Sequence, residues 1–236
     1  MKKMKLTVCG LSLALLVSSC GMTNTAKGGM IGGGAGAAVG ALVGGLVGNG
    51  KGAIIGAGVG TALGAGAGIL IGNKMDRAKK AAEAANAKAE VLTSENGVQY
   101  VKATFDSGLL FNTGSSTLST SAQASVKKFI TNLLAADNSF NLAICGFTDN
   151  QGFKNSTAEQ SAAKNVALSQ NRANAVKQQI IASGYPAARI THTDGYGEQY
   201  PVASNATADG QKQNRRVEVY ILASEDMIKA ANASAK

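Results

Sequence analysis

Two side chains of opposite charge, Asp149 and Arg172, are the strongest candidates for binding chemistry. Asp149 stands in the turn-prone loop TDNQG, where its carboxylate can accept hydrogen bonds from an ammonium group. Arg172 offers a planar fork of donors that fits a carboxylate. Asn165 and Ser169 precede Arg172 on the same face of a predicted helix. A fixed anion and a planar cation suit a ligand that carries both charges, and the alternative is a structural role in which Asp149 caps its turn and pairs with Arg172.

Other residue types that support catalysis are scarce. His192 is the only histidine, and it lies in ITHTDG, within a predicted strand and without a nucleophile at a telling spacing. The sequence contains no Cys/His metal cluster, P-loop or dinucleotide fingerprint, so we expect no metal and no cofactor. The net charge of +9 is not gathered beside stacking aromatic residues, which argues against nucleic acid as a partner. We therefore predict that the protein is not an enzyme, and a hydrolase or amidase is the weaker alternative.

Alternating and helical patterns place the candidate residues in a small mixed domain. Apolar residues alternate in VQYVKATF, FNLAICGF and RRVEVYIL, which predicts three strands, and RITHTDGYG predicts another. Apolar residues recur at helical spacing over residues 118–136, and a longer helix is predicted from Thr157 to Ser183, before Gly184. The order β-α-β-α-β-β predicts a two-layer α+β fold with helices packed on one sheet.

The N-terminus has the features of a targeting segment. A basic start, MKKMK, precedes the apolar run LTVCGLSLALLVSS and then Cys20. The ending LVSSCG resembles a bacterial lipobox, which implies that residues 1–19 are a lipoprotein signal peptide and that Cys20 becomes a lipidated first residue followed by a tether over residues 20–27. A plain secretory signal is the alternative. Because Cys9 is removed with the signal, only Cys145 remains unmodified, and we expect it to be a small buried side chain without a disulfide.

A regular glycine repeat follows the targeting segment. Glycine occurs at every fourth position from Gly32 to Gly72, with mostly Ala, Val, Leu and Ile between. Such a stripe lets two helix backbones approach closely. We predict a glycine-zipper helical hairpin over residues 28–73, and a flexible low-complexity tether is the alternative. Residues 74–96, rich in Lys, Ala and Glu, are predicted to form a helical linker in water, and residues 223–236 a C-terminal tail.

Four separated motifs resemble one known family. GFTDNQG, NVALSQNRANAV, GYGEQYPVASN and DGQKQNRRVEV occur in the order typical of the OmpA-like C-terminal domain, which is also found in peptidoglycan-associated lipoproteins. We place this domain at residues 97–222. With its lipobox and glycine zipper, the chain as a whole resembles the YiaD-type lipoproteins. The resemblance implies non-covalent binding of peptidoglycan through the diaminopimelate of its stem peptide, with Asp149, Asn165 and Arg172 as the residues that contact the ligand.

Three features depart from the family pattern. Phe147 stands where His is common, Gln211 stands where Arg is common, and the loop Gly152–Lys164 is longer than usual. The longer loop bears most directly on how the acid is placed against the arginine of the site. Arg215 and Arg216 alternate along a predicted strand, so we expect at least one of them in a structural ion pair or a pocket wall.

Together, these features predict a lipid-anchored protein of the cell outer membrane whose C-terminal domain lies in the periplasm. The residues after Cys20 are Gly21 and Met22, without the Asp that is typical of inner-membrane retention. The expected partners are peptidoglycan, outer-membrane lipid and, through the glycine zipper, further copies of the chain. The predicted function is to tether the outer membrane to the cell wall. The alternative is a glycine-zipper oligomer or pore-forming envelope protein that wall binding positions.

Overall fold

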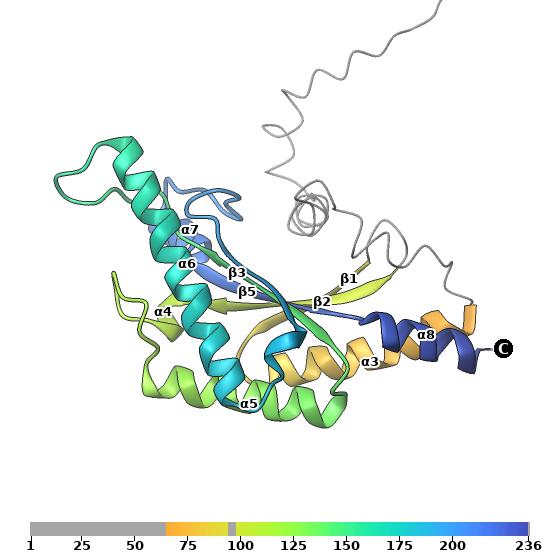
Figure 1. The fold of residues 1–236 in the computed structure, drawn as a ribbon. Helices are drawn as coiled ribbons and strands as arrows, with labels where there is room; N and C mark the ends of the chain where they lie inside the picture. The colour runs from red at the N-terminus through yellow and green to blue at the C-terminus, as the bar shows by residue number, and fades with distance from the viewer. Residues whose placement is uncertain (1–64, 94–97, 236) are drawn as a thin grey trace, which may run out of the picture. The chain divides into compact units, whose positions relative to one another are not determined.

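The computed structural model describes residues 65–93 and 98–235, which form the unit shown in Figure 1. The predicted signal peptide, Cys20, the tether over residues 20–27 and most of the predicted hairpin lie outside these residues. The elements of the described chain are, in order, α3 (Ala65–Glu83), β1 (Lys88–Thr93), β2 (Gln99–Asp106), α4 (Ser107–Leu110), α5 (Thr120–Ala136), β3 (Asn141–Phe147), α6 (Ala158–Ala182), the 3-10 helix η1 (Ala187–Arg189), β4 (Ile190–Gly195), α7 (Ala208–Asn214), β5 (Arg216–Leu222) and α8 (Glu225–Ser234).

A five-stranded sheet in the order β1-β2-β5-β3-β4 forms the frame of the unit. Neighbouring strands are antiparallel except β3 and β4, which are parallel and are connected by α6. Every residue of β5 is buried, because β5 pairs with β2 on one side and β3 on the other. The predicted two-layer α+β fold is confirmed, and the four predicted strands correspond to β2, β3, β4 and β5.

The main hydrophobic core lies between the sheet and the helices α3, α5 and α6 (Figure 1). Alternate strand residues point into it, including Phe105 in β2, Ile144 in β3 and Val219 in β5. Phe129 of α5 meets the ring of Phe105 edge to face, with 5.8 Å between ring centroids. The strands therefore bury the face that carries their alternate apolar residues, and α5 buries its apolar face against them, as the sequence patterns predict.

The other face of the sheet carries a smaller apolar cluster around a buried ion pair. Arg216 Nε donates to Glu218 Oε1 at 2.7 Å, and both side chains are almost completely buried. The hydroxyl of Tyr220 donates to the second oxygen of Glu218. Cys145 lies opposite Glu218 in the neighbouring strand, and burial raises the pKa of its thiol well above the ordinary value. Arg216 therefore forms a structural ion pair, as we expected of at least one of the two arginines.

Residues 74–93, the described part of the predicted linker, do not form a spacer in water, contrary to our prediction. The helix α3 ends at Glu83, and β1 then pairs with β2 at the edge of the sheet. One face of α3 is buried against the rest of the unit, and it consists mainly of alanine, whose small side chain permits close packing of the helix. The buried residues of α3 are Ala67, Ile71, Met75, Ala78, Ala81 and Ala82, and Ala85 and Ala87 are buried between α3 and β1.

The C-terminal residues also belong to the folded unit, so the predicted tail over residues 223–236 is wrong. Ser224 begins α8 as its N-cap and accepts a hydrogen bond from Met227 N at 3.2 Å. Met227, Ile228 and Ala231 are buried, and α8 packs against α3. Among the helices in the described ranges, none has the length and apolar character needed to cross a bilayer.

Candidate binding site

The end of β3 places Asp149 where the chain leaves the sheet. Thr148 N donates to Gly197 O at 2.8 Å, which joins this exit to the loop that follows β4. The side chain of Asp149 is 8% exposed and forms an ion pair with Arg215. Asp149 Oδ1 also accepts from Gln151 N at 3.2 Å, so the carboxylate closes its own turn as well. These contacts hold Asp149 as a fixed anion.

The helix α6 begins at Ala158, close to the start predicted at Thr157, and so takes up part of the loop that we expected to be longer than usual. Thr157 accepts from Gln160 N, and the Gln160 side chain accepts from Thr157 N, so a capping box starts the helix at Ala158. Much of the segment 152–164 therefore consists of the first turns of α6. Phe153 N donates to the hydroxyl of Ser161 at 3.1 Å, which fastens the short remaining loop to the helix.

Asn165, on the buried face of α6, connects two loops of the site. Its Nδ2 donates to Gln151 O at 3.3 Å and to Glu198 Oε2 at 3.2 Å. One turn further along, Ser169 Oγ accepts from Gly197 N at 2.9 Å. The face shared by residues 165, 169 and 172, which the spacing predicts, is therefore the face that α6 turns toward the loops after β3 and β4.

Arg172 is the second charged group of the site and is only 4% exposed. Its Nε donates to Ser115 O at 3.0 Å, and its guanidinium carbon lies 5.3 Å from the centre of the Phe111 ring. Burial lowers the pKa of Arg172 from its ordinary value, the like charge of Arg215 lowers it further, and Asp149 opposes both effects. Within the described part of the chain, no carboxylate forms an ion pair with Arg172.

The structure therefore brings the three predicted residues together but changes their pairing. Asp149 and Arg172 are near enough for their charges to interact, and the direct partner of Asp149 is Arg215. The sequence analysis identified Arg215 as one of two arginines that alternate along a predicted strand, but did not predict its partner. Glu198, which contacts Asn165, was missed, because nothing before the fold indicated that the loop after β4 meets α6.

Two glycines set the depth of α6 against the sheet. A Cβ atom on Gly146 of β3 would lie 2.2 Å from Ser169 O, and one on Gly195 of β4 would lie 2.1 Å from Gln170 N. Both distances are far shorter than any non-bonded contact that a real Cβ makes. The absence of a side chain at these positions lets the backbone of α6 rest on β3 and β4, which positions Arg172.

The two unusual residues of the family pattern have structural partners of their own. Phe147 is fully buried on the sheet face away from α6, where it stacks on Tyr196 with 5.5 Å between ring centroids. The guanidinium of Arg216 lies 3.8 Å from the centre of the Phe147 ring. Gln211, in α7, donates to Asn205 O at 2.9 Å. Neither departure therefore replaces a contact of Arg172.

The described residues also contain no cluster of three or more His, Cys, Asp or Glu side chains arranged to hold a metal ion. The charged groups of the site are thus Asp149, Arg172, Arg215 and Glu198, two acidic and two basic. Such an arrangement binds charged groups by hydrogen bonds and offers no activated nucleophile.

Comparisons with known proteins agree with this division of the chain. Residues 110–215 match the OmpA family, and residues 1–76 match the YMGG-like Gly-zipper. The chain is 38% identical over 119 residues to Motility protein B of Bacillus subtilis, which covers 50% of this chain and 44% of that protein. It is 42% identical over 76 residues to the Probable lipoprotein YiaD of Escherichia coli, covering 32% of this chain and 31% of that protein.

A third relative and one solved structure extend the comparison. The Peptidoglycan-binding protein ArfA of Mycobacterium tuberculosis is 39% identical over 80 residues, or 34% of this chain and 22% of that protein. The cell wall anchor of the T6SS from Pseudomonas aeruginosa has a TM-score of 0.50 and 26% identity, covering 64% of this chain and 99% of that one. The chain spans less than half the length of each of these three curated relatives.

Proposed function

We propose that this chain, in which residues 110–215 form an OmpA-like domain, binds peptidoglycan non-covalently and links it to a membrane. Peptidoglycan association is supported by the family match and by the relative that is named a peptidoglycan-binding protein. An OmpA-like domain of this kind is structural rather than enzymatic, so the prediction of a non-enzymatic protein is confirmed. The whole-protein activities of relatives that are only partly matched do not define this chain.

The observation that carries the proposal is a buried arginine beside a buried aspartate that it does not pair with. Arg172 uses Nε on a backbone carbonyl, which leaves its two Nη groups for a ligand carboxylate. Asp149 is held by Arg215, whose side chain is 37% exposed and can move aside for a ligand ammonium. The free end of diaminopimelate carries both an ammonium and a carboxylate. We therefore assign the stem peptide as the ligand and Asp149, Asn165 and Arg172 as its contacts.

The membrane attachment that we propose is a lipid on Cys20 in the outer membrane, with the OmpA-like domain in the periplasm. It is supported by the lipobox sequence, by the Gly-zipper match over residues 1–76 and by the relative named a probable lipoprotein. Several acyl chains with an apolar segment make such anchoring effectively permanent. Mass spectrometry of the mature N-terminus tests it, and a first residue without acyl mass would contradict it.

A second candidate function follows from the Gly-zipper match. The part of the glycine repeat that precedes α3, residues 28–64, can bring several copies of the chain together in a membrane, with wall binding only positioning the assembly. The size of the protein in mild detergent separates the two functions. A monomer that binds the wall supports a tether, whereas a discrete oligomer that conducts ions supports a pore.

Co-sedimentation of the full chain with purified sacculi tests the binding site. Asp149→Ala and Arg172→Ala each leave one ligand charge without a partner, which typically costs about 2–5 kcal/mol, or roughly thirty- to several-thousand-fold in affinity. Arg172→Lys should also bind poorly, because an ammonium cannot reproduce the bidentate fork. Arg77→Ala is the matched control, since Arg77 is exposed on α3. If both site variants are folded and co-sediment like wild type, the assigned site is wrong.

A further inference from the structure

The outward face of α3 combines exposed apolar and basic side chains. Ile69 is 68% exposed and Leu70 39% exposed, both near the beginning of the helix. Asn73, Arg77 and Lys80 follow at helical spacing and are also exposed. We call these five residues the α3 surface. The opposite face of the same helix is buried in the core, so the α3 surface must point away from the sheet.

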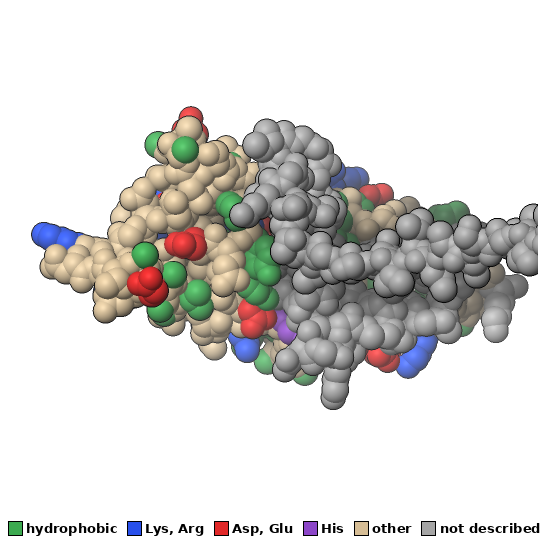
Figure 2. All heavy atoms as spheres, turned by 90° about the horizontal axis from the view of Figure 1, so that it is seen from above, with side chains coloured by type: hydrophobic (Ala, Val, Ile, Leu, Met, Phe, Trp, Pro, Cys, Tyr) green, Lys and Arg blue, Asp and Glu red, His purple; other side chains and the backbone are tan. Residues whose placement is uncertain are grey.

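The helices α3 and α5 carry more basic than acidic side chains. Lys127 and Lys128 are exposed on the neighbouring helix α5, which has no acidic residue within its bounds. Asp137, just after α5, is already paired with Lys74, and Glu83 lies 3.6 Å from Lys79. Asp76 is the remaining acidic residue of α3. Figure 2 views the unit from the side away from α3 and α5, where tan atoms make up most of the part not drawn in grey, with scattered acidic and apolar side chains and with Lys and Arg mainly at the margins.

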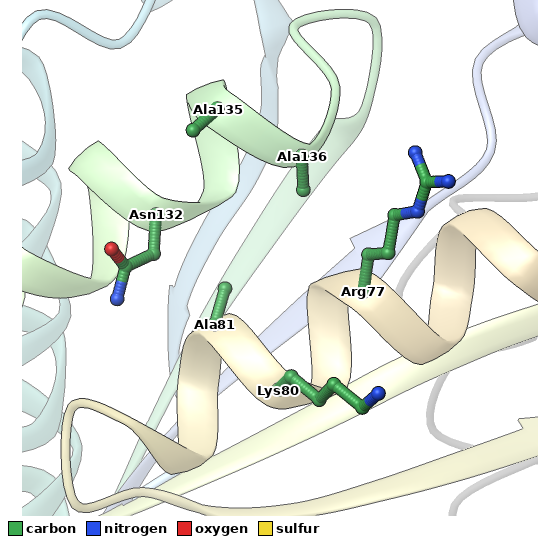
Figure 3. Close-up of a pocket in the computed structure, with 6 residues that line it drawn as sticks. All are labelled: Arg77, Lys80, Ala81, Asn132, Ala135 and Ala136. Carbon is green, nitrogen blue, oxygen red and sulfur yellow. The ribbon is translucent and has the colours of Figure 1, made fainter.

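A shallow groove of about 350 Å³ continues the α3 surface toward α5 (Figure 3). Ala81 points from α3 toward α5, and Ala136 points back toward α3, so the middle of the groove is apolar. Arg77 and Lys80 extend from α3 in different directions and do not converge on one point. This geometry suits charges spread over a surface better than a single bound ion.

We propose that the α3 surface docks on an anionic phospholipid bilayer. The chain before α3 supports this partner, because Lys51 is the only charged residue between Gly28 and Asn73. α3 begins within this glycine repeat and is already packed on the sheet, so no spacer separates the apolar sequence from the folded unit. Figure 1 also shows the start of α3 beside α8 at one end of the unit, and α4 and α7 at the other. The inference goes beyond wall binding and rests on the proposed attachment to a membrane.

Docking of this kind has an electrostatic and an apolar part. Each Lys or Arg near an anionic surface changes the ratio of docked to undocked molecules by about fivefold. This attraction falls off within a Debye length, so salt weakens it. Ile69 and Leu70 would enter the interface between the headgroups and acyl chains, as the apolar face of an interfacial helix does.

A single tryptophan provides the test, because the chain has none of its own. The full-length Ile69→Trp variant is reconstituted into phosphatidylcholine vesicles with and without phosphatidylglycerol. With the anionic lipid we expect emission at shorter wavelength and quenching by brominated acyl chains. Adding Arg77→Glu and Lys80→Glu should abolish both effects. Lys154→Glu combined with Lys164→Glu, an equal charge change at exposed residues of the loop before α6 and of α6 itself, should leave them unchanged.

The other outcomes overturn the proposal. The same emission in neutral and anionic vesicles would show that the α3 surface does not meet anionic lipid. A shift to shorter wavelength without quenching by brominated lipid, together with cross-linked dimers, would show that a second copy covers the α3 surface. Circular dichroism confirms that each variant is folded. Sacculus binding is measured separately without vesicles, so failure of the lipid test is distinct from failure of wall binding.

Discussion

At the scale of single residues, the site is defined by the choice of partner for Asp149. The carboxylate pairs with Arg215, the more exposed of the two nearby arginines, while the buried Arg172 keeps its Nη groups free of carboxylates in the described chain. Arg215 therefore occupies the place that we propose for a ligand ammonium. Its like charge also lowers the pKa of Arg172.

This arrangement predicts that Arg215 competes with the ligand. Arg215→Gln should preserve or strengthen co-sedimentation with sacculi, because it frees Asp149 to accept from the ammonium. The contrast with Arg172→Ala, for which we expect loss of binding, is the informative result. If Arg215→Gln instead abolishes binding in a folded protein, Arg215 contacts the ligand directly.

The residues of the site were more predictable than their pairs. Asn165, Ser169 and Arg172 share a helix face through their spacing alone, and the structure keeps that face together. The pair of Asp149 with Arg215 depends on the loop after β3 meeting the start of β5, which are 66 residues apart. Local sequence patterns do not contain that information. The structural alternative that we considered, a direct ion pair between Asp149 and Arg172, does not form.

At the scale of elements, close approach of α6 to the sheet depends on missing side chains. Gly146→Ala would place a Cβ 2.2 Å from the Ser169 carbonyl oxygen, which forces α6 to move. We expect a loss of about 1–3 kcal/mol in the free energy of unfolding, and weaker sacculus binding because Arg172 moves with the helix.

The control for this prediction is Gly68→Ala in α3, where nothing lies within 4 Å of the new Cβ. Since alanine is favoured over glycine in a helix interior by about 1 kcal/mol, this variant should be slightly more stable than wild type. Urea unfolding measures both. Equal stability of the two variants would show that the close approach of α6 to β3 does not contribute to the stability of the domain.

The contact between α3 and α5 has a pH dependence that can be measured. Burial opposes ionisation of Asp137, but hydrogen bonds from Lys74 and Ser139 outweigh it and hold the pKa of Asp137 below its ordinary value. The resulting stability is present above the ordinary carboxyl pKa and is lost as the pH falls through the lowered one. Because Lys74 is partly exposed, Lys74→Met should cost only about 0.5–1 kcal/mol at neutral pH.

The difference between wild type and Lys74→Met should disappear at a pH below the lowered pKa, where Asp137 is protonated in both proteins. Urea unfolding at neutral and strongly acidic pH measures this difference. Lys79→Met is a suitable control, since Lys79 makes only an exposed contact within α3. A difference that persisted in acid would assign the effect to packing of the longer side chain.

Elements within the recognised domain followed their sequence patterns, and the flanking elements did not. β2, β3, β4, β5, α5 and α6 agree with the predicted strands and helices to within a few residues. α3 has a composition typical of a solvated helix, yet its alanine face packs on the sheet. Alanine is common on both buried and exposed faces of helices. The spacing of large apolar residues therefore did not predict that this face of α3 is buried.

At the scale of the whole molecule, the folded unit is larger than the family match. The match covers residues 110–215, whereas α3, β1 and β2 lie before it and β5 and α8 lie after it. These flanking elements complete one edge of the sheet and cover part of the main core. In the function that we propose, the loops around Asp149 and the start of α3 therefore belong to one folded unit.

The last prediction tests this enlarged unit. A fragment of residues 97–222 lacks α3, β1 and α8, and with them the buried side chains of Ile71, Met75 and Met227. Removing one such side chain typically costs about 2–5 kcal/mol, while a small domain has only about 5–15 kcal/mol in total. We therefore expect the fragment to unfold at a much lower temperature than residues 65–236, and to bind sacculi weakly at temperatures where it is partly unfolded. Thermal melts followed by circular dichroism compare the two fragments. The same melting temperature for both would mean that α3, β1 and α8 do not contribute to the stability of residues 97–222.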